Sequence, residues 1–154
     1  MSAATPDGAI DLEAARLALR TDTTIDIVTT GARTGQTRTT EIWFTNVEGR
    51  IIITGTIRSG RGGPLLPRDW LANLTANPEF LFCFKESIAT SATALAHPVD
   101  DPIDRRSLMT ARATQWYRDQ GDTIDELVAD APIVDVEFTG GFAGLNQPRE
   151  GAAW

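Results

Sequence analysis

Residues 24–56 read TIDIVTTGARTGQTRTTEIWFTNVEGRIIITGT and contain three stretches with the composition of β-strands. Thr24–Thr30 is rich in β-branched residues, Arg38–Val47 alternates apolar and polar side chains, and Arg50–Thr56 contains three consecutive isoleucines. A Glu-Gly pair at 48–49 is a turn signal between the second and third stretches. The segment therefore predicts an antiparallel meander. Apolar groups on both faces of its second strand favour the wall of a barrel or of a dimer.

The rest of the chain adds helices and three more strands. Strands and helices do not alternate regularly along the sequence, as they would in a parallel sheet. The predicted fold class is therefore mainly β (α+β), a partly open antiparallel barrel of about six strands. It has an N-terminal helix, a short helix after strand three and a longer helix before the last strand. The elements are a helix capped by Asp11 and ending at Thr21–Thr23, a helix at Trp70–Ala76, strands at Glu79–Lys85 and Ile88–His97, a helix from Pro102 to about Gln120, an acidic helix at Asp122–Asp130 and a strand at Ile133–Phe138.

The length of 154 residues predicts a single domain, 1–154, with a flexible N-terminus (1–10) and a glycine-rich C-terminal tail (139–154). In that tail Phe142, Leu145 and Trp154 are candidates to contact a neighbouring subunit. No apolar run is long enough to span a membrane, and the first residues lack the pattern of a secretion signal. We expect a cytoplasmic protein.

Charge and cysteine content exclude several function classes. The net charge of −7 argues against nucleic-acid binding through a general basic surface. The chain has one cysteine and one histidine, so it forms no internal disulfide, and we predict no metal site. Cys83 lies in an apolar stretch and is predicted to be a buried, inert thiol, and His97 is predicted to be structural.

The most informative segment for function is Thr29–Arg38, TTGARTGQTR, between the first two predicted strands. Its glycines allow a tight turn whose N–H groups can converge on an anion, and Arg33 and Arg38 can add charge-assisted hydrogen bonds. The alternative is an ordinary hairpin with solvated arginines. A small phosphate-bearing ligand suits this loop better than a polymer does.

The order of the motifs resembles the deazaflavin-dependent nitroreductase and quinone reductase family. This family belongs to the split β-barrel, flavin-binding superfamily of pyridoxamine-phosphate oxidase-like proteins. The similarity runs from about Thr24 to Phe138, and it is most specific in the Thr-Gly-x-x-Thr-Gly-x-x-Arg loop and the Trp-Leu-x-Asn-Leu-x-Ala-Asn-Pro helix end. The similar segments are Thr30–Arg38, Trp43–Phe44, Ile53–Gly55, Gly62–Pro64 and Arg68–Pro78.

The resemblance implies an oxidoreductase with a split β-barrel, often dimeric, and we expect a homodimer. It would use reduced deazaflavin, coenzyme F-420, or FMN as the alternative, to transfer hydride to a small aromatic acceptor of quinone, nitro or enone type. The loop carries fewer basic residues than many family members have, with Ala32, Gln36 and Thr37 in their places, which keeps FMN open. Two other functions stay open. One is non-catalytic binding of a flavin, deazaflavin, haem or apolar ligand, and the other is a transformation of nitro or hydroxylamino compounds without a redox cofactor.

The resemblance also implies roles for individual residues. The phosphate arm of the cofactor would be held by Arg33, Thr34, Gly35, Gln36 and Arg38. The ring would lie along Thr54, Gly55, Thr56 and Arg58, with Trp70 and Asn73 closing that region. The candidate substrate wall is Trp43, Trp116 and Tyr117. The candidate catalytic residues are Tyr117 and Ser59, which could donate a proton or a hydrogen bond. Alternative roles are core packing for Trp70, core packing or dimer contacts for Trp116 and Tyr117, and helix capping for Asn73.

Overall fold

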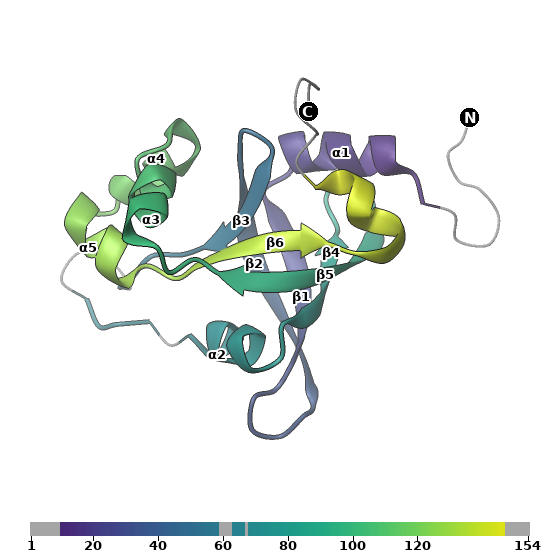
Figure 1. Cartoon of the computed structure of the whole chain (residues 1–154), viewed down its shortest axis with the longest axis horizontal. Coiled ribbons are helices and arrows are strands. Elements are labelled where there is room, and N and C mark those ends of the chain that lie inside the picture. Colours follow the sequence, from purple (N-terminus) through teal and green to yellow (C-terminus); the bar gives the residue numbers. More distant parts are fainter. Residues whose placement is uncertain (1–9, 59–62, 67, 147–154) are drawn as a thin grey trace.

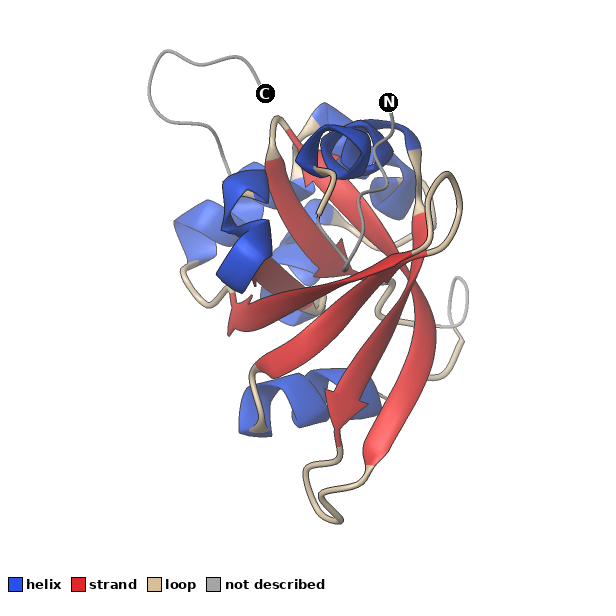
Figure 2. Ribbon diagram, turned by 90° about the vertical axis from the view of Figure 1, so that its right-hand side faces the viewer, coloured by secondary structure: helices blue, strands red, loops and turns tan. Residues whose placement is uncertain are grey.

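The computed structural model describes residues 10–58, 63–66 and 68–146. Six antiparallel strands close into a barrel in the order β1-β2-β3-β6-β5-β4 (Figures 1 and 2). They are β1 (Thr24–Thr30), β2 (Thr37–Val47), β3 (Arg50–Thr54), β4 (Glu79–Phe84), β5 (Thr90–Pro98) and β6 (Ile133–Phe138). The predicted fold class, a mainly β split antiparallel barrel, is confirmed, and every predicted strand is found within two residues of its expected ends.

Helices cover both ends of the barrel and one of its sides (Figure 1). They are α1 (Leu12–Thr21), α2 (Asp69–Ala76), α3 (Pro102–Met109), η2 (Arg112–Thr114), α4 (Gln115–Arg118), α5 (Ile124–Asp130) and η3 (Gly140–Leu145). In Figure 1, α1 and η3 lie over one end, α2 lies at the other end beside the β1–β2 hairpin, and α3, α4 and α5 lie to one side. Asp11 caps α1 as predicted, because its carboxylate accepts the N–H of Ala14.

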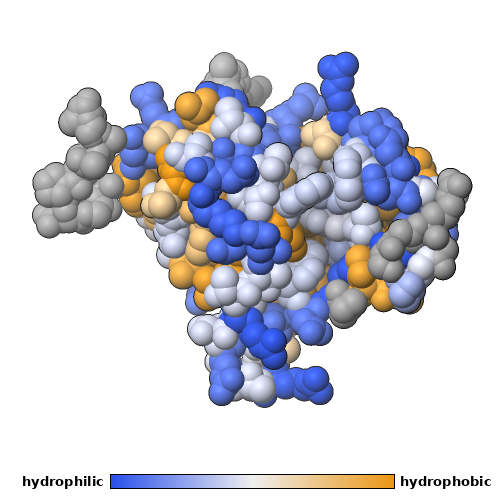
Figure 3. Space-filling view, turned by 180° about the vertical axis from the view of Figure 1, so that it is seen from behind, coloured by the Kyte–Doolittle hydropathy of each residue, from blue (hydrophilic) through white to orange (hydrophobic). Residues whose placement is uncertain are grey.

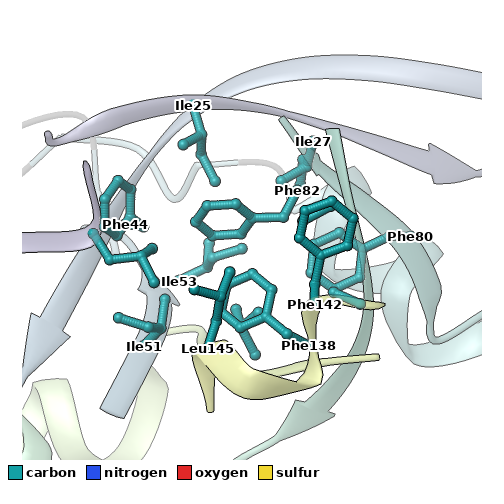
Figure 4. Packing of buried hydrophobic residues seen from close by; sticks show 14 of the residues in the cluster. Ile25, Ile27, Phe44, Ile51, Ile53, Phe80, Phe82, Phe138, Phe142 and Leu145 are labelled. Atoms are coloured by element: carbon teal, nitrogen blue, oxygen red, sulfur yellow. The ribbon is translucent and has the colours of Figure 1, made fainter. Parts of the chain in front are cut away.

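Phenylalanines and isoleucines fill the barrel because alternate residues of each strand point inward. Phe82 lies in the middle of this core (Figure 4). Its ring meets those of Phe44, Phe84 and Phe138 edge-on, with ring centroids 5.3, 5.1 and 5.1 Å apart. The same alternation turns Cys83 outward, so the prediction of a buried thiol is wrong: Cys83 is only half-buried, and its sulfur accepts a hydrogen bond from the Ser91 hydroxyl at 3.4 Å.

The long helix predicted before the last strand is broken. In place of one helix from Pro102 to Gln120, the chain forms α3, η2 and α4. The Thr114 hydroxyl lies within hydrogen-bond distance of the carbonyls of Leu108 (2.6 Å) and Ala111 (3.0 Å). The Arg118 guanidinium donates to the carbonyls of Met109 (2.7 Å) and Ala111 (2.8 Å). These side chains occupy carbonyls that a continuous helix would use, so the break is stabilised from within the segment.

Part of the predicted loose tail is ordered. Residues Gly140–Leu145 form η3, in which Phe142 and Leu145 are buried in the core of their own chain rather than against another subunit. The Arg16 side chain of α1 donates to the Gly144 carbonyl at 2.8 Å, and this bond fixes η3 against α1. Trp154, the third residue proposed as an anchor, lies outside the described residues.

An ion-pair network attaches the helical side to the barrel. Arg50 of β3 makes two bonds to Asp135 of β6, at 2.7 and 2.6 Å, and two to Asp104 of α3, at 2.7 and 2.8 Å. Hydrogen bonds from Arg50 lower the pKa of the Asp104 carboxyl, and those to both aspartates raise the pKa of the Arg50 guanidinium. One arginine therefore links two strands and a helix.

We expect Asp104→Asn to reduce the free energy of unfolding by about 1 kcal/mol at neutral pH, a modest value because the Asp104 side chain is 35% exposed. Since the folded-state pKa of Asp104 is below its unfolded value of about 3.9, this stabilisation is complete above that pH and is lost as pH falls through the lower folded pKa. Urea unfolding of both proteins across the acidic range measures the difference. Parallel stability curves down to the lowest pH would contradict the prediction.

Candidate functional site

The loop between β1 and β2 is a closed turn whose shape depends on its glycines. The Gly31 N–H donates to the Gln36 carbonyl at 2.7 Å, and the Gly35 N–H donates to the Gly31 carbonyl at 3.0 Å. Gly35 has φ = +71°, which L side chains rarely adopt. A Cβ at Gly31 would lie 2.9 Å from the Thr34 hydroxyl oxygen, so a larger residue there would displace the turn.

Most N–H groups of this loop already have partners. Besides the two glycines, the Gln36 N–H donates to the Thr34 hydroxyl at 3.2 Å, and the Ala32 N–H donates to the Asn73 side chain at 2.9 Å. Most of the N–H groups that we expected to bind an anion therefore stabilise the loop itself. An anion at this loop would depend on the side chains of Arg33 and Arg38.

Arg33 and Arg38 differ from most other cations of the protein. Both are exposed, and neither guanidinium has a hydrogen bond or an ion pair within the described residues. Arg50, Arg58, Arg106 and Lys85, in contrast, contact carboxylates, and Arg16, Arg105 and Arg118 donate to main-chain carbonyls. The hairpin projects from the barrel (Figure 1) and forms the hydrophilic projection at the lower end of Figure 3. Two uncompensated positive charges thus lie on one exposed hairpin.

Helix α2 fixes the base of this hairpin. The Asn73 amide nitrogen donates to the Thr29 hydroxyl at 3.4 Å, while its oxygen accepts from Ala32. Asn77, one helical turn later, donates to the Thr30 carbonyl at 3.3 Å. Trp70 is half-buried and packs against the barrel core. The sequence did not indicate the roles of Thr29 and Asn77, although the spacing of four residues between Asn73 on the predicted helix and Asn77 just after its end was an available signal.

The edge of β2 that faces β3 is open along part of its length. Residues 37–43 of β2 pair with β1, but pairing with β3 begins only at Phe44, opposite Ile53. At about 3.3 Å per residue, the open edge from Arg38 to Trp43 is about 17 Å long. The end of β3 lies beside it, with the Thr54 hydroxyl bonded to the Pro132 carbonyl at 2.5 Å, and Gly55 and Thr56 half-buried. Among the described residues, the edge of β2 from Arg38 to Trp43 is therefore unpaired on its β3 side, with the β1–β2 hairpin, here called the arginine hairpin, at one end.

Arg58 has a different position from the hairpin arginines. Its guanidinium contacts Asp122 at 2.9 Å and lies 3.7 Å from Glu126 of α5. Its backbone pairs with Leu65 in an isolated bridge, and the Leu66 N–H donates to the Ile57 carbonyl at 3.0 Å. Arg58 thus attaches the segment that follows β3 to the start of α5. The contact of Arg58 with a cofactor stays a prediction. Ser59 lies outside the described residues.

The three residues predicted to form the substrate wall lie together. The Trp43 and Trp116 rings are 5.1 Å apart and meet edge-on, and Trp116 and Tyr117 do the same at 5.1 Å. Trp43 comes from β2, whereas the other two come from α4. Both tryptophans are 46% exposed, so this cluster presents an aromatic surface near the end of the open edge.

Tyr117 is only 5% exposed and belongs to a second core cluster between the helices and the barrel. Burial raises the pKa of its phenol, and a hydrogen bond with the Thr45 side chain partly opposes this shift. The phenol is therefore protonated at neutral pH and already has a partner. Its role as a proton donor stays a prediction.

Among the described residues, no three His, Cys, Asp or Glu side chains are grouped closely enough to hold a metal ion. In the same part of the chain, no helix has the length and apolar character needed to cross a membrane.

Solved structures with this fold include proteins with different described roles. Rv2991, a conserved hypothetical protein from Mycobacterium tuberculosis, is 15% identical, with 87% of this chain and 84% of that chain covered and a TM-score of 0.56. An F420 reductase is 17% identical, with 88% and 97% covered and a TM-score of 0.53. A Clostridium acetobutylicum protein of the pyridoxinephosphate oxidase family is 12% identical, with 85% and 86% covered and a TM-score of 0.55. At these identities the similarity establishes the fold alone.

The family of the chain follows from its sequence rather than from its fold. No curated protein matches the chain. A family model described as F420H(2)-dependent quinone reductase matches residues 14–134, which include the arginine hairpin, α2, β3 and the aromatic cluster. The chain therefore belongs to the F420H(2)-dependent quinone reductase family and is a reductase whose cofactor is coenzyme F-420.

Proposed function

We propose that this protein uses reduced coenzyme F-420 to transfer hydride to small quinone-type acceptors, with nitro and enone compounds as further acceptors. The observation that carries the proposal is the pair of uncompensated guanidiniums, Arg33 and Arg38, at one end of an open strand edge. The exposed aromatic cluster near its other end supports an aromatic acceptor.

The residues at the hairpin have the chemistry that a phosphate requires. A guanidinium forms strong hydrogen bonds to phosphate oxygens, and in a protein of net charge −7 an anion needs such a local positive site. On this proposal Arg33, Thr34, Gly35, Gln36 and Arg38 hold the phosphate arm, and Thr54, Gly55 and Thr56 lie along the ring. Trp70, which packs against the barrel core, would close the cofactor region on the side of α2. FMN, which also carries a phosphate, is the alternative cofactor.

The aromatic cluster would orient the acceptor. Trp43 and Trp116 offer ring faces and edges on which a flat quinone can stack, and the Tyr117 hydroxyl forms a hydrogen bond with the Thr45 side chain. The bound deazaflavin supplies the hydride. Tyr117 would hold a proton near the acceptor oxygen, and Ser59 would offer a second hydrogen-bond donor.

Absorption spectra of the purified protein, titrated separately with coenzyme F-420 and FMN, test the cofactor. Anaerobic mixing of the reduced complex with a quinone, a nitroarene and a cyclic enone then tests the acceptor. We expect tighter binding of the deazaflavin and fastest reoxidation by the quinone. Binding of neither cofactor, or a reduced complex that no acceptor oxidises, would contradict the proposal.

Replacing Trp116 by alanine should raise the KM for a quinone about five- to tenfold and leave deazaflavin affinity unchanged, because one stacking partner of the acceptor is removed. Steady-state kinetics at saturating cofactor measure the effect. Ile103→Ala is the matched control, since Ile103 of α3 is exposed, at 81%, and apolar but lies outside the aromatic cluster. Equal KM changes in both variants would contradict a role for Trp116 in acceptor binding.

The homodimer and the cytoplasmic location expected from the sequence stay predictions. Light scattering on the purified chain gives the mass of the particle in solution and tests the dimer.

A further inference from the structure

The side chain of Asn73 connects three parts of the molecule at the base of the arginine hairpin. From α2, its oxygen accepts the Ala32 N–H at 2.9 Å, and its nitrogen faces the Thr29 hydroxyl of β1 at 3.4 Å. Thr29 is buried, whereas Ala32 is exposed and directly precedes Arg33. One carboxamide thus ties the buried end of a strand to the exposed loop.

This contact adds an anchor outside the loop to the hydrogen bonds that the loop makes within itself. Gly31 and Gly35 allow many backbone conformations, so ordering the loop around an anion carries a high entropic cost. The Asn73 bond fixes the peptide between these glycines before any ligand arrives. Preorganisation of this kind raises affinity without adding a contact to the ligand.

We propose that Asn73 is a positioning residue that holds Arg33 and Arg38 for the cofactor's phosphate through the Ala32 N–H. This inference rests on the proposed function, and it replaces direct contact of Asn73 with the cofactor by an action through the loop. Both polar atoms of the carboxamide already have protein partners, which supports this assignment.

Asn73→Ala should weaken deazaflavin binding roughly fivefold, the usual size of one net hydrogen bond. Thr75→Ala is the matched control, because Thr75 lies on the same helix but its hydroxyl donates to the Leu71 carbonyl of α2 itself, at 2.8 Å, rather than to the loop. We expect less than a twofold change for it. Thr29→Val, which removes the hydroxyl that faces Asn73 and keeps the volume, should weaken binding about twofold.

Two readouts separate positioning from general loss of structure. The salt dependence of deazaflavin binding should weaken less in Asn73→Ala, in which both guanidiniums remain, than in Arg38→Ala, in which one of them is removed. Adding Asn73→Ala to Arg33→Ala should cost less than Asn73→Ala alone, because Asn73 acts partly through Arg33. Hydrogen exchange of the Ala32 amide should be faster in Asn73→Ala.

Wild-type affinity in Asn73→Ala would overturn the positioning role and leave the proposed function intact. Additive losses with Arg33→Ala, or a salt dependence that weakens as much in Asn73→Ala as in Arg38→Ala, would also overturn it. A wild-type chain that binds no deazaflavin would overturn the proposed function and this inference together.

Discussion

Replacing Arg33 and Arg38 together by alanine is expected to weaken deazaflavin binding about a hundredfold. A hydrogen bond to a charged group contributes about 1.5–3 kcal/mol, and the lower value applies here because both side chains are exposed. Two such contacts give about 3 kcal/mol, which corresponds to roughly two powers of ten in Kd. Fluorescence titration with coenzyme F-420 measures the change, and the unfolding midpoint should stay close to that of the wild type because neither guanidinium has a protein partner among the described residues.

The matched control removes the same charge elsewhere. Arg20 of α1 and Arg112 of η2 also have no hydrogen bond or ion pair for their guanidiniums among the residues that the structure describes. A double Arg20→Ala, Arg112→Ala variant therefore has the same net charge as the hairpin variant. If both doubles lose affinity equally, the hairpin only contributes to the general field of the protein and holds no phosphate.

The sequence predicted the barrel well because its strands are encoded locally. β-Branched and aromatic residues alternate with polar ones, and the Glu48-Gly49 turn has φ = 51° and 93°, as the hairpin signal requires. The predictions that were wrong concern segments whose structure depends on contacts between residues far apart in the sequence. Gly140–Leu145 looked like a loose tail because glycines carry no hydrophobic pattern, yet Phe142 and Leu145 fold back over the end of the barrel.

The same distinction explains which features of the site were predictable. The glycines and arginines of the hairpin were visible in the sequence because they lie within one turn. The ion pair of Arg58 with Asp122 joins residues 64 positions apart, and the contact of Asn73 with Ala32 joins residues 41 positions apart. Periodicity and composition carry no information on such pairs. The aromatic cluster lies between these cases, since its members were identified singly but their association across β2 and α4 required the fold.

Phe82→Ala should reduce the free energy of unfolding by about 4 kcal/mol, the largest effect on stability that we expect from one substitution. Phe82 is fully buried, and the loss combines the transfer free energy of the ring, the cavity left behind and three edge-on ring contacts. A closed barrel cannot easily collapse onto the cavity, because its wall is held by a continuous ladder of strand pairs.

Leu81→Ala on the same strand is the control for Phe82→Ala, since Leu81 is half-buried and on the outer face, and a loss of about 1 kcal/mol is expected there. Urea denaturation at neutral pH measures both. A loss below about 2 kcal/mol for Phe82→Ala would mean that the barrel wall moves inward to fill the space, and would contradict a wall held in place by its strand pairs.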